Sequence, residues 1–312
     1  MKGIAVLLLL LLSIATFSCK NKTSQNQPKK IAVIVSTLNN PWFVVLAETA
    51  AAKSRALGYE AKIFDSQNNT ALEADHFENA LTSGYNAILF NPTDADGSVV
   101  NVLKAKKAGV AVFCMDREIN STVAATSQIL SDSYSGCIAI GKDFVQKMNK
   151  KGKYVELLGL VGDNNTWSRS KGFHSVVDHY PGLKMVAQQS ADFDRNKAME
   201  VMESILQAHP DIDGVFCGND AMAMGAYQAL SASGKANKVK VFGFDGAADV
   251  LQSISESKIQ ATGMQFPVIM AETAAIYAQD YFKGKRDFPQ KVPIGVELVT
   301  AENIKEYSSN KN

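Results

Sequence analysis

The sequence predicts an α/β protein made of two similar lobes, each a doubly wound parallel sheet. Apolar strand-like runs alternate with helical segments, and the alternation starts again near Ser131 without a flexible linker. The strand candidates are apolar nearly throughout, as expected for parallel strands that are covered on both faces. They are KIAVIV (30–35), EAKIFD (60–65), AILFNP (87–92), VAVFCMD (110–116), YVELLGL (154–160), MVAQQSAD (185–192), GVFCGND (214–220) and KVFGFDG (240–246).

The segments between these strands carry helix start and stop signals. In PWFVVLAETAAAKSRALG (41–58), Asn40 can cap the helix, Pro41 suits its first position and Gly58 suits its exit. The segment ALEADHFENALTSG (71–84) also ends on Gly. A βα alternation is therefore predicted in both halves of the chain.

Composition excludes several classes of protein. A length of 312 residues predicts about two domains, and a formal net charge of +1 gives no reason to expect binding to nucleic acid or to an anionic membrane surface. Cys114, Cys137 and Cys217 lie far apart among apolar neighbours, so we expect buried free thiols rather than disulfides.

The N-terminus predicts export. Residues 1–18 contain one Lys, an apolar run too short to span a bilayer and then small residues, which is typical of a signal peptide. The signal ends at Cys19, which resembles the lipobox of bacterial lipoproteins, and residues 19–29 form a polar tether. We expect a periplasmic or cell-surface protein that touches the membrane only through a lipid on Cys19. Plain secretion is the alternative.

Polar clusters follow several predicted strands. Because the carboxyl ends of parallel strands meet at one edge of a sheet, these clusters should face a common crevice. Ordinary turn chemistry is the alternative explanation for any one of them. The clusters are STLNN (36–40), NPTD (91–94), MDR (115–117), GND (218–220) and FDG (244–246).

At these residues the chain resembles the periplasmic ribose-binding protein and its sugar-binding relatives, which are the substrate-binding components of ABC importers. The resemblance runs from Lys30 to Val299 and includes DSQNN (65–69), ADFDR (191–195) and AHPD (208–211). It implies a three-segment hinge near Ser131–Asp132, Gly263–Gln265 and Pro293–Gly295. It also implies an N-terminal lobe of residues 30–131 plus 265–293 and a C-terminal lobe of residues 132–264 plus 294–309.

The same motifs imply which residues hold the sugar. Trp42 stands where the family has Phe, Trp167 stands where the ribose protein has a second Arg, and Ala221 replaces an acidic residue. The implied ligand-binding residues are Ser36, Asn40, Trp42, Phe43, Asn91, Asp116, Arg117, Arg169, Phe193, Asn219, Asp245 and Gln265.

These residue types suit a monosaccharide. Trp42 and Phe43 from one lobe and Phe193 from the other would clamp the apolar faces of the sugar ring. Asp, Arg, Asn and Gln side chains supply the donors and acceptors that hydroxyl groups need. Two Asp and two Arg leave this set neutral, which suits an uncharged ligand. D-Ribose is the first expectation, and allose, another pentose or a ketose are the alternatives.

Other functions have less support in the sequence. The four His residues lack a metal-binding or triad context. Asp116 and Asp245 could act as an acid–base pair, but nearby Arg residues should keep both ionised. We therefore expect no enzyme, cofactor or metal. A transcriptional regulator would need a DNA-binding helix where the export signal stands. We expect a monomer whose partner is an ABC permease. A sensor that feeds a chemoreceptor or a kinase is the alternative.

Overall fold

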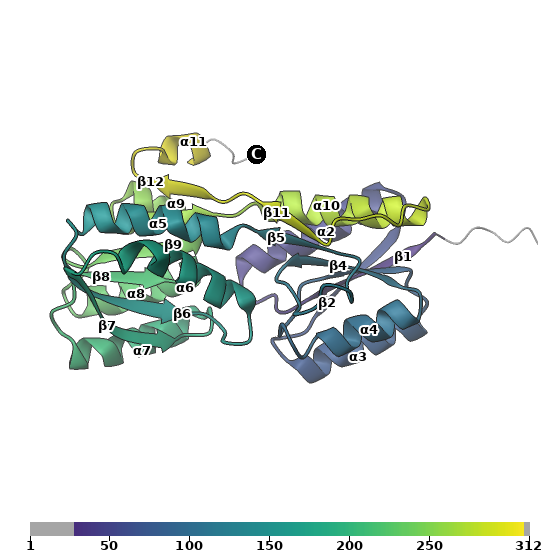
Figure 1. Cartoon of the computed structure of the whole chain (residues 1–312), viewed down its shortest axis with the longest axis horizontal. Coiled ribbons are helices and arrows are strands. Elements are labelled where there is room, and N and C mark those ends of the chain that lie inside the picture. The colour runs from purple at the N-terminus through teal and green to yellow at the C-terminus, as the bar shows by residue number, and fades with distance from the viewer. Residues whose placement is uncertain (1–27, 309–312) are drawn as a thin grey trace, which may run out of the picture.

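The computed structural model describes residues 28–308, and the predicted signal peptide and Cys19 lie outside the described residues. Within this range the chain forms two α/β lobes, each built on a six-stranded sheet (Figure 1). The fold class predicted from the sequence is confirmed.

The sheet of the N-terminal lobe has the order β11-β5-β4-β3-β1-β2, and all of its strand pairs are parallel. Its inner strands are apolar on both faces because helices cover both. Helices α2 (Pro41–Ala56) and α10 (Pro267–Phe282) pack on one face, and α3 (Thr70–Thr82) and α4 (Val99–Lys107) on the other. The strands are β1 (Lys30–Val35), β2 (Glu60–Asp65), β3 (Ala87–Phe90), β4 (Ala111–Asp116), β5 (Ser127–Ser131) and β11 (Lys291–Ile294).

The C-terminal lobe repeats this arrangement with the order β12-β10-β9-β8-β6-β7, in which β12 runs antiparallel to β10. Its strands are β6 (Gly152–Leu158), β7 (Leu183–Ser190), β8 (Gly214–Cys217), β9 (Lys240–Asp245), β10 (Ala261–Met264) and β12 (Glu297–Thr300). Its helices are α5 (Ser133–Lys147) and α6 (Asn164–Val177) on one face, α7 (Arg195–Ala208), α8 (Asp220–Ala232) and α9 (Ala248–Ser255) on the other, and the short α11 (Ile304–Ser308).

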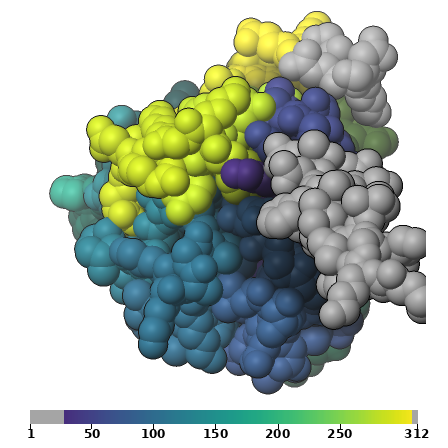
Figure 2. All heavy atoms as spheres, turned by 90° about the vertical axis from the view of Figure 1, so that its right-hand side faces the viewer, coloured from purple at the N-terminus to yellow at the C-terminus, as the bar shows by residue number. Residues whose placement is uncertain are grey.

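The chain passes from one sheet to the other after β5, after β10 and after β11. These passages lie between the lobes in Figure 1. Figure 2 looks at the far end of the N-terminal lobe, where the start of β1 lies beside the end of α10. The sequence analysis did not predict β5, β10, β11 or β12, each of which is only four or five residues long.

The three cysteines of the described chain are free and buried, as predicted. Among residues 28–308, no helix is both long and apolar enough to span a bilayer. In the same range no group of three or more His, Cys, Asp or Glu side chains is placed to hold a metal ion.

Candidate functional site

The loops that follow the strands of both lobes face one another and surround a buried cavity. The free space there is about 260 Å³, a volume that includes solvent at its opening. Ten of the twelve residues singled out in the sequence analysis line it. The lining residues are Asn40, Trp42, Phe43, Asp116, Arg117, Asp163, Asn165, Arg169, Phe193, Asn219, Asp245 and Gln265.

The start of α2 supplies the aromatic wall of the N-terminal lobe. The side chain of Asn40 caps this helix by accepting a hydrogen bond from the backbone N–H of Trp42 at 3.0 Å. The Trp42 and Phe43 rings meet edge to face, with their centroids 5.4 Å apart. Both rings also pack into the core of their lobe. The two side chains therefore both stabilise the core of the N-terminal lobe and line the cavity.

Phe193 supplies the opposing ring from the C-terminal lobe. Its backbone has φ +60°, a conformation that non-glycine residues rarely adopt. Its ring lies against Gly159, where an added Cβ would stand 2.0 Å from the ring edge. The positive φ and the missing side chain at Gly159 together fix the ring beside the cavity.

Two guanidinium groups lie against these rings. The Cζ atom of Arg117 is 4.9 Å from the centroid of the Phe43 ring, and the Cζ atom of Arg169 is 5.5 Å from the centroid of the Phe193 ring. The Cζ atom of Arg169 also lies 4.0 Å from the centroid of the Phe244 ring. Such contacts hold the planar guanidinium groups in fixed orientations.

Asp245, Gln265 and Arg169 form one connected polar group. The Gln265 amide donates to Asp245 Oδ1 at 2.7 Å, and Arg169 Nη1 lies 3.5 Å from the same oxygen. Arg169 Nη1 also donates to the carbonyl of Gly218 at 2.8 Å. Asn219 lies next to this group, because it follows Gly218 in the chain. It caps α8 by accepting a hydrogen bond from Met222 N at 2.9 Å.

Ser36 and Asn91 are not brought to the cavity surface. Both are fully buried behind Asp116. The Asn91 amide donates to Asp116 Oδ2 at 3.3 Å, and Ser36 Oγ donates to Asn91 Oδ1 at 2.6 Å. These two side chains position the Asp116 carboxylate instead of lining the cavity.

Asp163 and Asn165 line the cavity although the sequence analysis did not single them out. Asp163 caps α6, and its Oδ2 lies 2.6 Å from Arg117 Nε of the other lobe. The polar run GDNN (162–165) follows β6 as the five predicted clusters follow their strands, and that signal could have identified both residues. The expected balance of two carboxylates and two guanidinium groups is wrong, because Asp163 adds a third carboxylate.

Burial changes the titration of two of these carboxyls. It raises the pKa of Asp116 from 3.8 to about 7, although Arg169 acts to lower it. Burial also raises the pKa of Asp245 from 3.8 to about 7, although Arg169 acts to lower it. The expectation that nearby arginines keep both groups ionised therefore holds only above about pH 7, because desolvation outweighs the attraction.

Several buried polar atoms at the cavity lack a hydrogen-bond partner among the described residues. They are the indole N–H of Trp42, Oδ1 of Asp116, Nε of Arg169, and Nε of Arg117 with Oδ2 of Asp163, which face each other as an ion pair without hydrogen-bond geometry. An unpaired buried polar group costs about 1–3 kcal/mol. A ligand with both donor and acceptor groups, such as a polyhydroxylated ring, would remove this cost.

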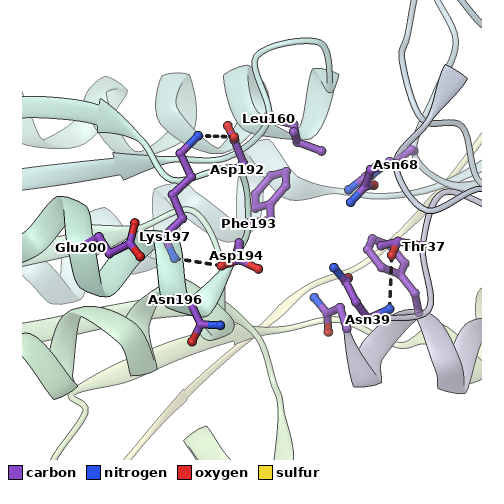
Figure 3. A pocket seen from close by; sticks show the side chains of 13 residues that line it. Thr37, Asn39, Asn68, Leu160, Asp192, Phe193, Asp194, Asn196, Lys197 and Glu200 are labelled. Atoms are coloured by element: carbon purple, nitrogen blue, oxygen red, sulfur yellow. Dashed lines mark hydrogen bonds and ion pairs between the residues drawn. The ribbon is translucent and has the colours of Figure 1, made fainter.

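A wider opening lies beside the cavity (Figure 3). Thr37, Asn39 and Asn68 face it from the N-terminal lobe, and Leu160, Asp192 and Lys197 are among those that face it from the C-terminal lobe. Trp167 is not part of either space: its side chain is 40 % exposed and donates to the carbonyl of Val161 at 2.9 Å. Ala221 also lies outside the cavity lining.

Comparison with known proteins defines the class of protein. A family model described as a periplasmic binding protein domain matches residues 31–286. The D-apiose import binding protein of Paraburkholderia graminis is 42 % identical, with 88 % of each chain covered. The ribose import binding protein of Bacillus subtilis is 38 % identical, with 85 % of this chain and 86 % of the relative covered.

Solved structures agree with this similarity. A solute-binding protein of an ABC transporter from Bacillus halodurans, solved with bound myo-inositol, matches with a TM-score of 0.86 at 27 % identity, over 92 % of this chain and 99 % of that one. The chain belongs to the periplasmic binding protein family. Within it, this protein is an exported sugar-binding component of an ABC importer and not an enzyme.

Proposed function

We propose that this protein binds one uncharged pentose between its two lobes and delivers it to the permease of an ABC importer. The observation that carries the proposal is the composition of the buried cavity. Aromatic rings from both lobes and hydrogen-bonding side chains from both lobes surround the same small space. That combination matches the apolar faces and polar edges of a sugar ring.

D-Apiose and D-ribose are the two candidate ligands. D-Ribose is the sugar expected from the sequence motifs, and D-apiose, a branched pentose, appears in the name of a relative at 42 % identity. We place D-apiose first because that relative is the more similar of the two compared above. Trp42, which is bulkier than the Phe of the ribose proteins, favours a compact sugar.

In this proposal the ten predicted residues that line the cavity contact the sugar directly. Trp42, Phe43 and Phe193 pack on the ring, and Arg117, Arg169, Asp116 and Asp245 hydrogen-bond hydroxyl groups. Asn40, Asn219 and Gln265 complete the rim. Ser36 and Asn91 act through Asp116, whose carboxylate they hold.

Hinge closure is the proposed mechanism. The three passages between the sheets would form the hinge, and they divide the chain into the two lobes given above. The closed form gains further stability when both lobes touch the sugar. The permease would then distinguish the closed form from the open one.

Membrane attachment is proposed through Cys19, with residues 19–29 as the tether and the protein as a monomer. Mass spectrometry of the N-terminal peptide from native membranes should show a diacylglycerol-modified Cys19. An unmodified N-terminus in the soluble fraction would instead support plain secretion.

A thermal-shift panel of pentoses and hexoses tests the ligand. A sugar at about 100 times its dissociation constant should stabilise the protein by about 2.7 kcal/mol. We expect D-apiose or D-ribose to give the largest shift, with hexoses well below. A panel in which no pentose shifts the melting temperature would overturn the proposal.

A further inference from the structure

An ion pair joins the two lobes inside the cavity. Asp163 belongs to the C-terminal lobe, and its Oδ2 lies 2.6 Å from Nε of Arg117 in the N-terminal lobe. The side chains of both residues are at most 3 % exposed. The pair can form only when the cleft is closed, because its partners lie on different lobes.

This contact fixes the orientation of Arg117. The Asp163 carboxylate forms an ion pair with Nε, the carbonyl of Pro92 accepts from Nη1 at 3.3 Å, and the Cζ atom lies over the Phe43 ring. Nη2 has no hydrogen-bond partner among residues 28–308, which leaves it for a ligand. An Arg with two of its three nitrogens held presents the third in a defined direction.

The segment around Asp163, residues 160–165, leads into the first turn of α6 and also contacts the opposite lobe. The carbonyl of Gly162 accepts from the backbone N–H of Ala95 at 2.9 Å, and the Asn164 amide donates to Asn120 Oδ1 at 2.6 Å. A Cβ on Gly162 would stand 2.1 Å from the Asp94 carboxylate, so a larger residue could not approach this closely. The cross-cleft position of Asp163 is thus set by a closely fitted loop.

We propose that Asp163 is a positioning residue for sugar recognition, and this inference rests on the proposed function. Asp163 holds Arg117 in its sugar-binding orientation only after the lobes have closed. The sugar is therefore held most tightly in the closed form, and its release requires the ion pair to break. Removing one partner of a buried ion pair leaves the other charge uncompensated, which is strongly unfavourable.

A capping role alone is the competing explanation, and the chemistry of the cap separates the two. Asp163 Oδ1 accepts from Asn165 N at 2.9 Å to begin α6. Asn caps helices as well as Asp does. Asp163→Asn therefore keeps the cap and removes the charge that pairs with Arg117, and Asp163→Ser is a second variant that keeps a capping oxygen.

The test is a double-mutant cycle on sugar affinity, measured by calorimetry with D-apiose and D-ribose on the exported protein. Asp163→Asn should weaken binding at least about tenfold. In an Arg117→Gln background, Asp163→Asn should weaken sugar binding less than twofold, because the guanidinium group that pairs with Asp163 is already absent. Asp249→Asn is the control, since Asp249 pairs with Arg195 on the exposed surface of one lobe, and it should leave affinity unchanged.

Stopped-flow kinetics add a readout that a folding defect would not reproduce. Because the pair forms after closure, Asp163→Asn should raise the dissociation rate and change the association rate less than twofold. Affinity losses of Asp163→Asn and Arg117→Gln that simply multiply would overturn the inference. So would unchanged binding by both Asp163 variants. If the unmodified protein binds no pentose, the proposed function itself fails.

Discussion

Phe193 shows how much of the site depends on single residues. Its positive φ and its packing on Gly159 place the ring opposite Trp42 and Phe43. Strained backbone of this kind persists only where surrounding contacts hold it, and it often marks a functional position. The proposed clamp requires this ring, because it is the aromatic side chain that the C-terminal lobe contributes to the cavity lining.

Replacing this ring should weaken binding. Burial of a Phe side chain contributes about 1.5–3 kcal/mol, so Phe193→Ala should lower sugar affinity roughly 10- to 150-fold. Isothermal titration calorimetry measures the change. Tyr134→Ala, which removes an exposed aromatic ring of the same lobe, is the control and should bind normally. Binding by Phe193→Ala within twofold of the original would argue against the clamp.

At the scale of elements, the site is built from helix N-termini. Asn40, Asp163 and Asn219 each cap a helix and also line the cavity. The capping interaction anchors each side chain by one oxygen. The second oxygen of Asp163 pairs with Arg117, and the Asn219 amide donates to the carbonyl of Phe193 at 3.4 Å. The fold therefore positions three polar groups of the site with the same hydrogen bonds that begin α2, α6 and α8.

Asn219 allows these two roles to be separated. Asn219→Asp keeps the cap but replaces the amide that donates to the carbonyl of Phe193 with a carboxylate, so sugar affinity should fall at least about tenfold. Asn69→Ala removes the cap of α3 away from the cavity, so it should cost about 1 kcal/mol of stability and leave affinity intact. Urea unfolding and calorimetry measure both quantities. Equal affinity for Asn219→Asp and the original would exclude a ligand contact.

The sequence predicted some elements and not others for physical reasons. Strands such as β1 and β4 could be predicted because nearly every residue in them is apolar and buried. β5 could not, because it buries Ser127 and Gln128, whose side chains are paired with Pro289 and Ile119. Those partners are distant or local loop residues, and a pattern of hydrophobicity does not reveal them.

The sequence motifs predicted most residues of the site, but they did not predict the contact between the two lobes. Motif similarity identified Arg117 and Phe193 because MDR (115–117) and ADFDR (191–195) match motifs of the family. The sequence also shows that Asp163 can begin a helix, but not that it reaches Arg117. That contact depends on how the two lobes meet, which a one-dimensional pattern does not encode.

For the whole molecule, burial of Asp116 and Asp245 couples closure to pH. Both have pKa values of about 7 when buried, against an ordinary value of 3.8. The neighbouring charges at Asp116 are Arg169, Asp163, Arg117 and Asp245. If opening exposes both carboxyls to water, closing takes up protons between about pH 4 and pH 7. Lower pH should then favour the closed form of the sugar-free protein.

Spin labels across the cleft can measure this effect. We expect the sugar-free protein to be more closed at pH 5 than at pH 8. The double variant Asp116→Asn, Asp245→Asn should be equally closed at pH 5 and pH 8, because its amide side chains do not titrate. Identical distance distributions at both pH values in the unmodified protein would contradict the coupling.

Closure should also be visible in solution when the sugar is added. Small-angle scattering at pH 8 should show a smaller radius of gyration with saturating sugar than without it. Phe193→Ala, measured at the same sugar concentration, should compact less because less of it is bound. A radius that does not change in the unmodified protein would exclude hinge closure.

The central claim is that rings from opposing lobes hold a pentose between them while paired charges and amides bind its hydroxyls. A crystal structure with the tightest-binding pentose tests this most directly. The account predicts the sugar between Trp42, Phe43 and Phe193, with Arg117 and Arg169 hydrogen-bonded to its oxygens. A sugar bound outside this cavity, or a closed structure in which these three rings do not touch it, would contradict the account.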